Sequence, residues 1–269
     1  MPTYSHAITS TRRRQLLAAA GASLLGCAFP GGAIASAIWR QLDAAVQSVG
    51  QSEILDSGLQ LTLPLVAEDG SSVPLTVSSN GLQGRRIERL EIFAPNNPTP
   101  EVAIFEFGPD VSRVELMTRI RLSESQTVIA VAHTSDGKVI IAERAVRVTV
   151  SGCIAPAKSD PASEMKARVR VPQSWTTGDT GEVLTMISHP MITGLAADAS
   201  GNTPSERIIR SFQASLEGEP VVKAQYFRSL SANPYLKFQF APSKAGELHF
   251  EWTEDTGRKV EVTEKVSLA

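Results

Sequence analysis

Cysteine and histidine, from which many metal and nucleophilic sites are built, are scarce in this chain. It has two cysteines and four histidines among 269 residues. A zinc site needs three or four converging ligands, and no cysteine pair or helical histidine pair supplies them. We therefore expect His133, His189 and His249 to serve packing or hydrogen bonding, while His6 lies in the N-terminal segment described below. No metal site and no resident cofactor is predicted.

The chain also lacks the short motifs of two large enzyme classes. No serine stands in a nucleophile-elbow pattern, and no glycine-rich loop opens a helix. The adjacent carboxylates Glu254 and Asp255 stand beside Gly257, which is typical of a solvated turn. The sequence therefore predicts a protein that is not itself an enzyme.

Neither sign of charge dominates the composition. Lysine and arginine number 26 and the acidic residues 28, which gives a formal net charge of -2. A protein that binds nucleic acid needs a basic stripe to neutralise phosphates, so nucleic acid is excluded as an expected partner. The 42% of hydrophobic residues and 20% of charged residues are typical of a globular protein.

Residues 1–37 have the pattern of an export signal. A basic start is followed by an apolar stretch rich in Ala and Leu. Arg13 and Arg14, followed by Gln-Leu-Leu, fit a twin-arginine signal, which predicts export to the periplasm. The apolar run is shorter than the roughly 20 residues that span a bilayer, so no membrane span is predicted. Small residues suited to a signal peptidase end the segment: Ala33, Ala35 and Ala37.

A second interpretation of this segment starts from Cys27. The letters LLGC at residues 24–27 resemble a lipoprotein processing site, although Leu25 is not favoured at its position. Cleavage after Ala35 or Ala37 is the preferred interpretation, with lipidation of Cys27 the alternative. Either way, Cys153 is the one cysteine in the body of the protein. In an oxidising compartment a lone cysteine indicates intermolecular pairing or deliberate reactivity.

The hydrophobic pattern changes period once along the rest of the chain. Between Ile38 and Ile54, apolar residues recur every three or four positions, which predicts a short helix. From Leu59 onward, apolar residues occur at every second position in short runs. Turn signals separate these runs, and no helical stretch lies between them. This pattern predicts an antiparallel β-sandwich of immunoglobulin type. The predicted strands start at Leu59, Val73, Ile87, Glu101, Val114, Gln126, Lys138 and Ala145.

A segment rich in Pro, Ala and Ser, CIAPAKSDPASE, follows these strands and has the composition of a linker. Alternation resumes beyond it and predicts a second sandwich of the same type. Its strands start at Met165, Gly181, Arg207, Glu219, Tyr235, Gly246 and Lys259. The predicted fold class is all-β, with a signal over 1–37, a first immunoglobulin-like domain over 38–153, a linker over 154–164 and a second domain over 165–269.

Cys153 is the best candidate for chemistry. It follows Gly152, comes after the last apolar residue of the strand pattern, Val150, and precedes the linker, so we expect it to be exposed. The alternative is a small buried hydrophobe. An accessible thiolate exchanges sulfur-bound groups through covalent intermediates. No cationic residue follows Cys153 before Lys158, which favours a carrier whose partners supply the catalysis over an enzyme with its own activated nucleophile.

Several stretches resemble a known pair of proteins. RIRLSESQTVIAVAHTSDGKV and ERAVRVTVSGC resemble the SoxY subunit of the bacterial sulfur-oxidation carrier, and GEVLTMISHPMITG and GELHFEWTEDTG resemble SoxZ. The resemblance implies a fused SoxYZ-like carrier whose two domains dock within one chain. It implies that Cys153 holds thiosulfate-derived or sulfane-sulfur groups, with Ser151 and Gly152 in a flexible arm. The implied partners are SoxXA-, SoxB- or SoxCD-like enzymes and c-type cytochromes.

The chain departs from SoxY around the cysteine. SoxY normally ends in Gly-Gly-Cys-Gly-Gly, whereas here Ile154, Ala155 and Pro156 follow the cysteine and the chain continues. Ile154 and Pro156 restrict the backbone where glycine would leave it free. In this respect the chain resembles fused SoxYZ-like carriers associated with periplasmic quinoprotein dehydrogenases. The alternative function is therefore a non-catalytic binding or assembly module accessory to such a dehydrogenase. A thiol oxidoreductase is disfavoured because a two-cysteine motif is missing.

Overall fold

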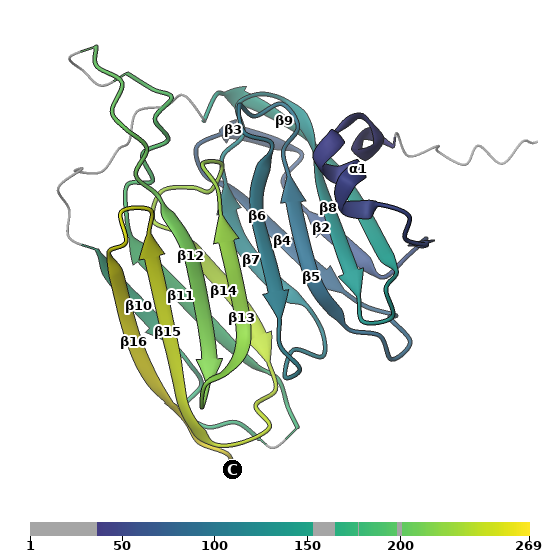
Figure 1. The fold of residues 1–269 in the computed structure, drawn as a ribbon, viewed down its shortest axis with the longest axis vertical. Coiled ribbons are helices and arrows are strands. Elements are labelled where there is room, and N and C mark those ends of the chain that lie inside the picture. Colours follow the sequence, from purple (N-terminus) through teal and green to yellow (C-terminus); the bar gives the residue numbers. More distant parts are fainter. Residues whose placement is uncertain (1–36, 153–164, 177, 198–200) are drawn as a thin grey trace, which may run out of the picture. The chain divides into compact units, whose positions relative to one another are not determined.

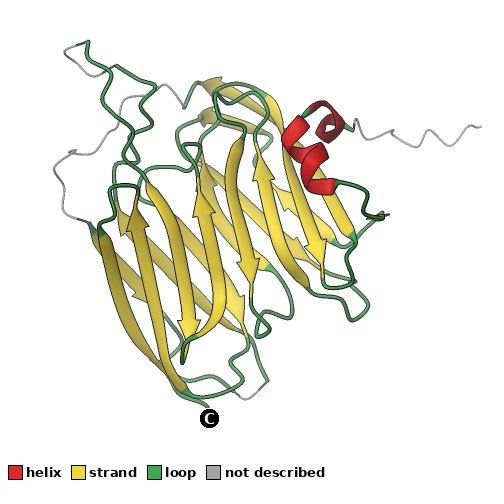
Figure 2. Ribbon diagram, in the orientation of Figure 1, coloured by secondary structure: helices red, strands yellow, loops and turns green. Residues whose placement is uncertain are grey.

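The computed structural model describes residues 37–152, 165–176, 178–197 and 201–269. The twin-arginine signal, Cys27, Cys153 and the linker lie outside the described residues. The described chain is almost entirely β-structure with one short helical segment, which confirms the predicted fold class (Figures 1 and 2). Its elements are η1 (Ile38–Gln41), α1 (Asp43–Val49), β1 (Ile54–Leu55), β2 (Leu59–Thr62), β3 (Val66–Asp69), β4 (Val73–Ser79), β5 (Ile87–Phe93), β6 (Glu101–Phe107), β7 (Glu115–Ile120), β8 (Gln126–Thr134), β9 (Val139–Val150), β10 (Lys166–Arg170), β11 (Gly181–Ser188), β12 (Ile209–Leu216), β13 (Glu219–Tyr226), β14 (Tyr235–Phe240), β15 (Gly246–Glu254) and β16 (Lys259–Val266).

The predicted N-terminal helix is present but short. A 3-10 turn, η1, leads into α1, which ends before Gly50, a glycine with a φ of +55°. Its ψ of -128° places Gly50 outside the usual left-handed helix cap, in a conformation that glycine adopts without steric cost. The buried side chains of Ala45 and Val49 pack against Phe93 and Ile129 of the neighbouring sheet. The helix therefore covers part of one sheet in the first half (Figure 2).

The strands form two sheets, and each sheet contains strands from both halves of the chain (Figure 1). The larger sheet has the order β1-β9-β8-β5-β6-β13-β12-β15-β16, with β3 also paired to β9. The smaller sheet has the order β10-β11-β14-β7-β4-β2. The halves meet where β6 pairs with β13 and where β7 pairs with β14, both antiparallel. Residues 37–269 consequently form one compact unit.

The larger hydrophobic core cluster extends across the place where the halves meet. Phe105 of β6 is fully buried, pairs in register with Ala224 of β13, and meets the ring of Tyr226 edge to face at 6.2 Å between centroids. On the smaller sheet, Leu236 of β14 pairs with Thr118 of β7. Burial of Tyr226 raises its pKa far above the ordinary value. Two interlocked sandwich halves thus share both sheets and the core between them.

The first predicted strand is the main departure from the sequence-based pattern. The run that starts at Leu59 is broken by Leu63 and Pro64 into β2 and β3, which join different sheets. Proline has no N–H to give to a ladder, so it marks the place where the chain crosses over. β3 then pairs with β9 in parallel, as does β1. These two short parallel pairings correct the expectation of an entirely antiparallel sandwich.

Candidate functional site

The candidate site is the place where the described chain leaves the first half. β9 ends at Val150, which is 58% exposed, and Gly152, two residues further on, is buried. Cys153, the next residue, lies outside the described residues. What the structure defines is therefore the support from which Cys153 extends.

Three segments of backbone close around this point in a cycle of hydrogen bonds. The Gly70 N–H donates to the Val150 carbonyl at 2.8 Å, and the Leu122 N–H donates to the Gly70 carbonyl at 2.8 Å. The Gly152 N–H donates to the Leu122 carbonyl at 2.9 Å. We call these four residues the exit junction. Buried backbone groups that are paired in this way hold the chain in one position.

The exit junction requires glycine at two positions. A Cβ atom on Gly152 would stand 2.0 Å from the Gly70 carbonyl carbon and oxygen and 2.3 Å from the Ser71 nitrogen. A Cβ on Gly70 would stand 2.3 Å from the Leu122 oxygen. Close packing thus accounts for a glycine at 152, and the flexible arm at Ser151 and Gly152 stays a prediction. Ser151 is described and partly buried, so the fixed part of the chain reaches the residue before Cys153.

A buried arginine ties the exit junction to the second half. The side chain of Arg121, only 4% exposed, follows β7 and donates from Nη1 to the Gly152 carbonyl at 3.5 Å. Nη2 donates to the Met191 carbonyl at 3.0 Å, and Nε donates to the Leu230 carbonyl at 3.2 Å. Arginine suits this position because its planar fork carries five donors. One guanidinium therefore joins the residue before Cys153 to two loops of the other half.

The loop that receives Arg121 is itself held by a buried polar pair. His189 Nδ1 accepts a hydrogen bond from the Met191 N–H at 3.1 Å, and its Nε2 lies 2.9 Å from Glu254 Oε1. Burial lowers the pKa of His189, against the opposing effect of Glu254, so the ring is neutral at pH 7 with its proton on Nε2. Burial raises the pKa of Glu254, but hydrogen bonds from Thr256 and His189 outweigh it and hold that pKa below the ordinary value.

These findings confirm the expected packing role of His189. They also correct the expectation that Glu254 lies in a solvated turn, since it is 2% exposed and pairs with His189. Arg121 and Gly70 are 32 and 83 positions away from Cys153, inside a strand pattern and a turn signal that look ordinary. No motif marks either residue. The sequence after Cys153 shows no cationic residue before Lys158, whereas the fold brings the Arg121 guanidinium to the carbonyl of Gly152.

A serine, a histidine and a glutamate meet elsewhere without forming a catalytic triad. Ser48 Oγ of α1 donates to Glu91 Oε1 at 2.9 Å and lies 3.0 Å from His133 Nε2. The same nitrogen of His133 lies 3.3 Å from Glu91 Oε1. A triad uses the two ring nitrogens for its two partners, so this arrangement has no relay through the ring. It attaches the helix to the sheet.

One cluster among the described residues could approach a metal ion. His249, Glu251 and Glu261 lie on neighbouring strands β15 and β16, with ligand atoms within 4.8 Å of one another. Glu251 already accepts from Lys259 Nζ at 2.9 Å, and His249 Nδ1 meets the Thr263 hydroxyl at 3.2 Å. The cluster is therefore explained as the polar outer face of a sheet, and the absence of a metal site stays a prediction.

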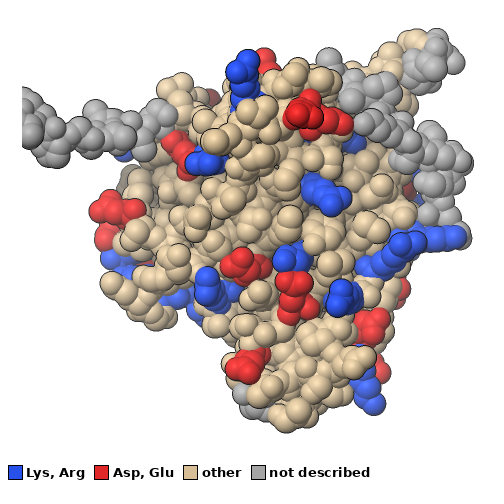
Figure 3. All heavy atoms as spheres, turned by 180° about the vertical axis from the view of Figure 1, so that it is seen from behind, with Lys and Arg blue, Asp and Glu red and all other residues tan. Residues whose placement is uncertain are grey.

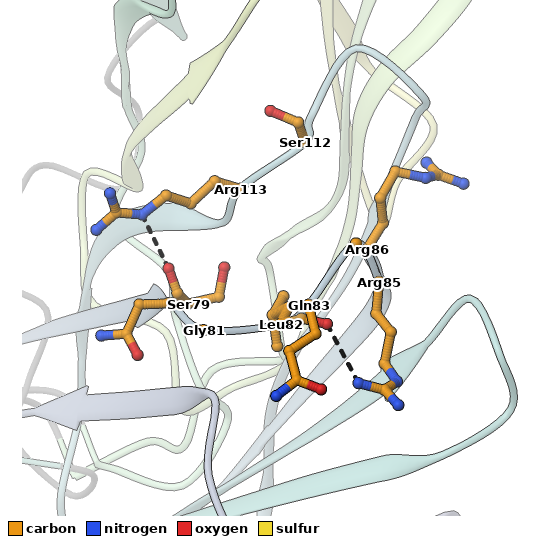
Figure 4. Close-up of a pocket in the computed structure, with 10 residues that line it drawn as sticks. Ser79, Gly81, Leu82, Gln83, Arg85, Arg86, Ser112 and Arg113 are labelled. Atoms are coloured by element: carbon orange, nitrogen blue, oxygen red, sulfur yellow. Dashed lines mark hydrogen bonds between the residues drawn. The ribbon is translucent and has the colours of Figure 1, made fainter.

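Figure 4 shows a pocket of about 310 Å³ whose lining includes three arginines. Arg85 Nε pairs with Asp136 at 2.7 Å, Arg86 pairs with Glu88 at 2.8 Å, and Arg113 Nε donates to the Ser79 carbonyl at 2.8 Å. The three guanidinium groups point in different directions (Figure 4). An anion site needs donors that converge on one point, which these guanidinium groups do not. Their interactions with protein partners explain their positions.

One face of the molecule carries mixed charge, and the described helices are short. On the face opposite to the view of Figure 1, basic and acidic side chains are interspersed (Figure 3). That face lacks the basic field that binds nucleic acid. α1, with seven residues, is the longest helix described, and no helix there has the length and apolar character of a bilayer span.

Fold and site together define a class of protein: two immunoglobulin-like sandwich halves that share their sheets, with one cysteine directly after the first half. Residues 46–153 match the family "Sulfur oxidation protein SoxY", and residues 169–265 match the family "Sulphur oxidation protein SoxZ". The chain carries these two domains in tandem and belongs to the SoxY and SoxZ families as a fused SoxYZ-like protein. The match to the first family runs to residue 153 and so includes Cys153.

Solved structures and curated proteins give the following likenesses. The sulfur carrier protein SoxY from Chlorobium limicola f thiosulfatophilum is 31% identical, with 40% of this chain and 94% of that chain covered and a TM-score of 0.35. A superoxide reductase (neelaredoxin) from Ignicoccus hospitalis is 14% identical, with 34% of this chain and 80% of that chain covered and a TM-score of 0.29. None of the curated proteins matches the chain.

Proposed function

We propose that this protein is a periplasmic covalent carrier of sulfur compounds. In this role Cys153 holds thiosulfate-derived or sulfane-sulfur groups while partner enzymes of sulfur oxidation load and unload them. The observation that carries the proposal is the position of Cys153. It is the last residue of the SoxY match and directly follows a residue fixed at the junction of the two halves. The SoxY neighbour is described as a sulfur carrier protein, which supports the same role.

A carrier of this kind needs no catalytic group of its own. Sulfur–sulfur bonds are made and broken by thiolate exchange, and the partner enzyme supplies the activating groups. In each polar cluster described away from the exit junction, the side chains bind partners within the protein, and these contacts hold the fold together. We expect the partners to be SoxXA-, SoxB- or SoxCD-like enzymes and c-type cytochromes, and we expect export through the twin-arginine signal.

The decisive experiment is the intact mass of the protein taken from the periplasm of cells that express it. We expect a fraction of wild-type chains to carry extra sulfur on Cys153, and this mass to vanish after treatment with a thiol reductant. Cys153→Ser is the matched control, since it should carry no adduct and should abolish growth on the sulfur substrate. Absence of any adduct, together with unchanged growth of the Cys153→Ser strain, would contradict the carrier function.

Fusion of the domains favours a second candidate, an assembly module accessory to a periplasmic quinoprotein dehydrogenase. Both halves are in one chain and share both sheets, so the cysteine is followed by a second domain rather than by a free tail. Affinity purification of wild type and Cys153→Ser distinguishes the two functions. Recovery of the same dehydrogenase with both proteins, with no sulfur on the wild type, supports the assembly module.

A further inference from the structure

The smaller sheet has a second face that points away from the core, and Figure 3 views the molecule from this side. In β11, β14, β7 and β4, buried side chains alternate with partly buried or exposed ones, and in β10 the residues on either side of Val169 are exposed. We propose that this outer face is a docking surface for a partner protein whose own surface is acidic around an apolar centre. That the partner is an enzyme which loads or unloads the carrier rests on the proposed function, whereas the docking surface itself does not.

One row of side chains crosses the outer face at right angles to its strands. Arg168 of β10 lies opposite Met186 of β11, which lies opposite Tyr235 of β14. Arg119 of β7 lies over the Tyr235 ring, with 5.3 Å between its guanidinium carbon and the ring centroid, and pairs with Pro74 of β4. The row uses strands of both halves, so neither half alone presents it.

A second row runs beside the first, two residues away along each strand. Arg170 lies opposite Leu184, and Leu184 lies opposite Lys237. Lys237 in turn lies opposite Met117, which pairs with Thr76. Tyrosine, methionine and arginine, which recur in the two rows, are residue types that are enriched at protein interfaces. The rows therefore have the composition of an interface, with apolar side chains in the middle and two arginines at the β10 edge.

The charge of these rows determines which kind of partner fits. Each row contains two basic side chains and no acidic one. The acids beside the rows are compensated, because Glu182 Oε2 lies 2.9 Å from Lys237 Nζ and Glu115 lies 3.9 Å from an arginine outside the rows. Arg168 and Arg170 are exposed, and neither pairs with an acidic side chain of the described residues. Because the whole chain has a net charge of -2, an acidic partner is drawn to this face in preference to the rest.

The β10 edge of the outer face is hollowed by a pocket of about 560 Å³. Arg170 and Leu184 line it, together with Gln173 and Glu182. Since the charge of Glu182 is compensated by Lys237, the guanidinium of Arg170 is the cation that a partner side chain meets there. Arginine binds carboxylates through two parallel hydrogen bonds. The pocket therefore fits an Asp or Glu side chain at the rim of the partner's apolar centre.

Other occupants fit this face less well. A second copy bound face to face brings two faces of net positive charge together, which costs free energy. A bilayer surface requires apolar side chains that project into the lipid. Leu184, Met186 and Tyr235 are all partly buried within the sheet, so they do not project in this way. A protein with a matching acidic rim satisfies both the charge and the flat apolar middle.

The size of the outer face sets the strength of the contact. Its five strands are spaced about 4.8 Å apart and are about 25 Å long, which gives an area of about 500 Å². A stable complex buries about 800 Å² on each partner, and smaller contacts are typical of transient encounters. We therefore expect weak and rapidly reversible binding. Such binding suits a carrier that has to leave one partner before it meets the next.

The first part of the test is photo-crosslinking in cells that express the full-length chain. A photo-reactive residue replaces Met186 on the outer face. The matched control position is Gln225, which is exposed on the outer side of β13 in the larger sheet. We expect irradiation to link position 186, and not position 225, to one other protein. Mass spectrometry should locate the link in a segment rich in Asp and Glu.

The second part measures the affinity of the purified full-length chain for the protein identified in this way. The double variant Arg168→Glu/Arg170→Glu should weaken binding about tenfold or more, because it replaces attraction by repulsion. Lys223→Glu/Lys265→Glu changes the net charge equally on the larger sheet and should stay within about twofold of wild type. Raising NaCl from about 50 mM to about 500 mM should weaken wild-type binding, because salt screens exposed charges.

The inference is overturned if position 186 gives no more product than position 225, or if its product is lipid, a second copy or the same chain. It is also overturned if the Arg168→Glu/Arg170→Glu variant binds like wild type, or if both double variants weaken binding equally. Should Arg168→Glu/Arg170→Glu fail to fold, as seen in a thermal melt, an affinity of wild type that salt leaves unchanged rejects the inference. Failure of the carrier function looks different: the partner still docks, also on Cys153→Ser, but no sulfur adduct is found on protein from cells.

Discussion

At the scale of single residues, the exit junction shows how much a missing side chain can matter. Gly70 and Gly152 meet so closely that their backbones leave no room for a Cβ on either. At the turn of Gly84, by contrast, a Cβ would meet open space, and the positive φ of +87° alone makes the position favour glycine. Close packing of the backbone therefore explains why residue 152 is glycine.

Replacement of Gly152 by alanine should destabilise the protein and disturb Cys153. Because the new methyl group would overlap the Gly70 carbonyl, we expect a loss of about 1–3 kcal/mol in the free energy of unfolding, the usual effect of overpacking. Urea denaturation measures this. Ser151→Ala, one residue earlier and only partly buried, is the control and should change stability by less than about 0.5 kcal/mol. Equal stability of Gly152→Ala and wild type would show that the junction relaxes freely.

At the scale of elements, a charged cluster fastens α1 to the larger sheet. Glu91 of β5 accepts hydrogen bonds from Ser48 of the helix and from Arg89 Nε at 2.9 Å each. Burial raises the pKa of Glu91, but the hydrogen bonds from His133, Arg89 and Ser48 outweigh it and hold that pKa at about 2. The ionised carboxylate is therefore the form that keeps the helix in place.

The sign of the resulting pH dependence is fixed by this lowered pKa. The Glu91 contribution is complete above the unfolded value of 4.5 and is lost as the pH falls through about 2. At pH 6 we expect Glu91→Gln to be less stable than wild type by up to about 3 kcal/mol, and the difference to shrink toward pH 2. Urea unfolding at several pH values measures it. Glu88→Gln, which alters an exposed pair with Arg86, should show almost no difference, and a constant deficit of Glu91→Gln at every pH would refute the assignment.

At the scale of the whole molecule, two halves behave as one folded unit. Five residues of β13 pair with β6, three of β14 pair with β7, and the core is continuous between them. An edge strand of each half is thus covered by the other half, which removes exposed edges that could pair with other chains. The linker adds a covalent connection to an interface that is already extensive.

Cleavage of the linker should therefore leave the halves together. A protease site placed between Pro156 and Ala162 allows the chain to be cut after folding, and we expect the two fragments to elute from a sizing column as one peak at the position of the uncut protein. The paired strands and shared core provide the physical reason. Two separate peaks under native conditions would show that the covalent link, rather than the interface, holds the halves.

The sequence alone determined much of this protein, because the relevant signals are local. Period-two alternation predicts the strands from Val73 to Val266, except that the two runs predicted from Lys138 and Ala145 form one strand, β9. Turn residues predict most of the strand ends. The strand pattern also places the lone Cys153 after the end of β9. It did not predict the break at Pro64, because the run on both sides of that residue alternates in the same way.

Only the tertiary structure decided which strands pair across the halves and what surrounds the residue before Cys153. The alternation of apolar and polar residues shows which face of a strand is buried, but not which other strand it pairs with. The pairings of β6 with β13 and of β7 with β14 could therefore not be predicted from the sequence. In the same way, no local signal connects Gly70 or Arg121 to Gly152, since these contacts join segments about 30 and 80 positions apart. Long-range packing, rather than local preference, sets the environment from which the cysteine extends.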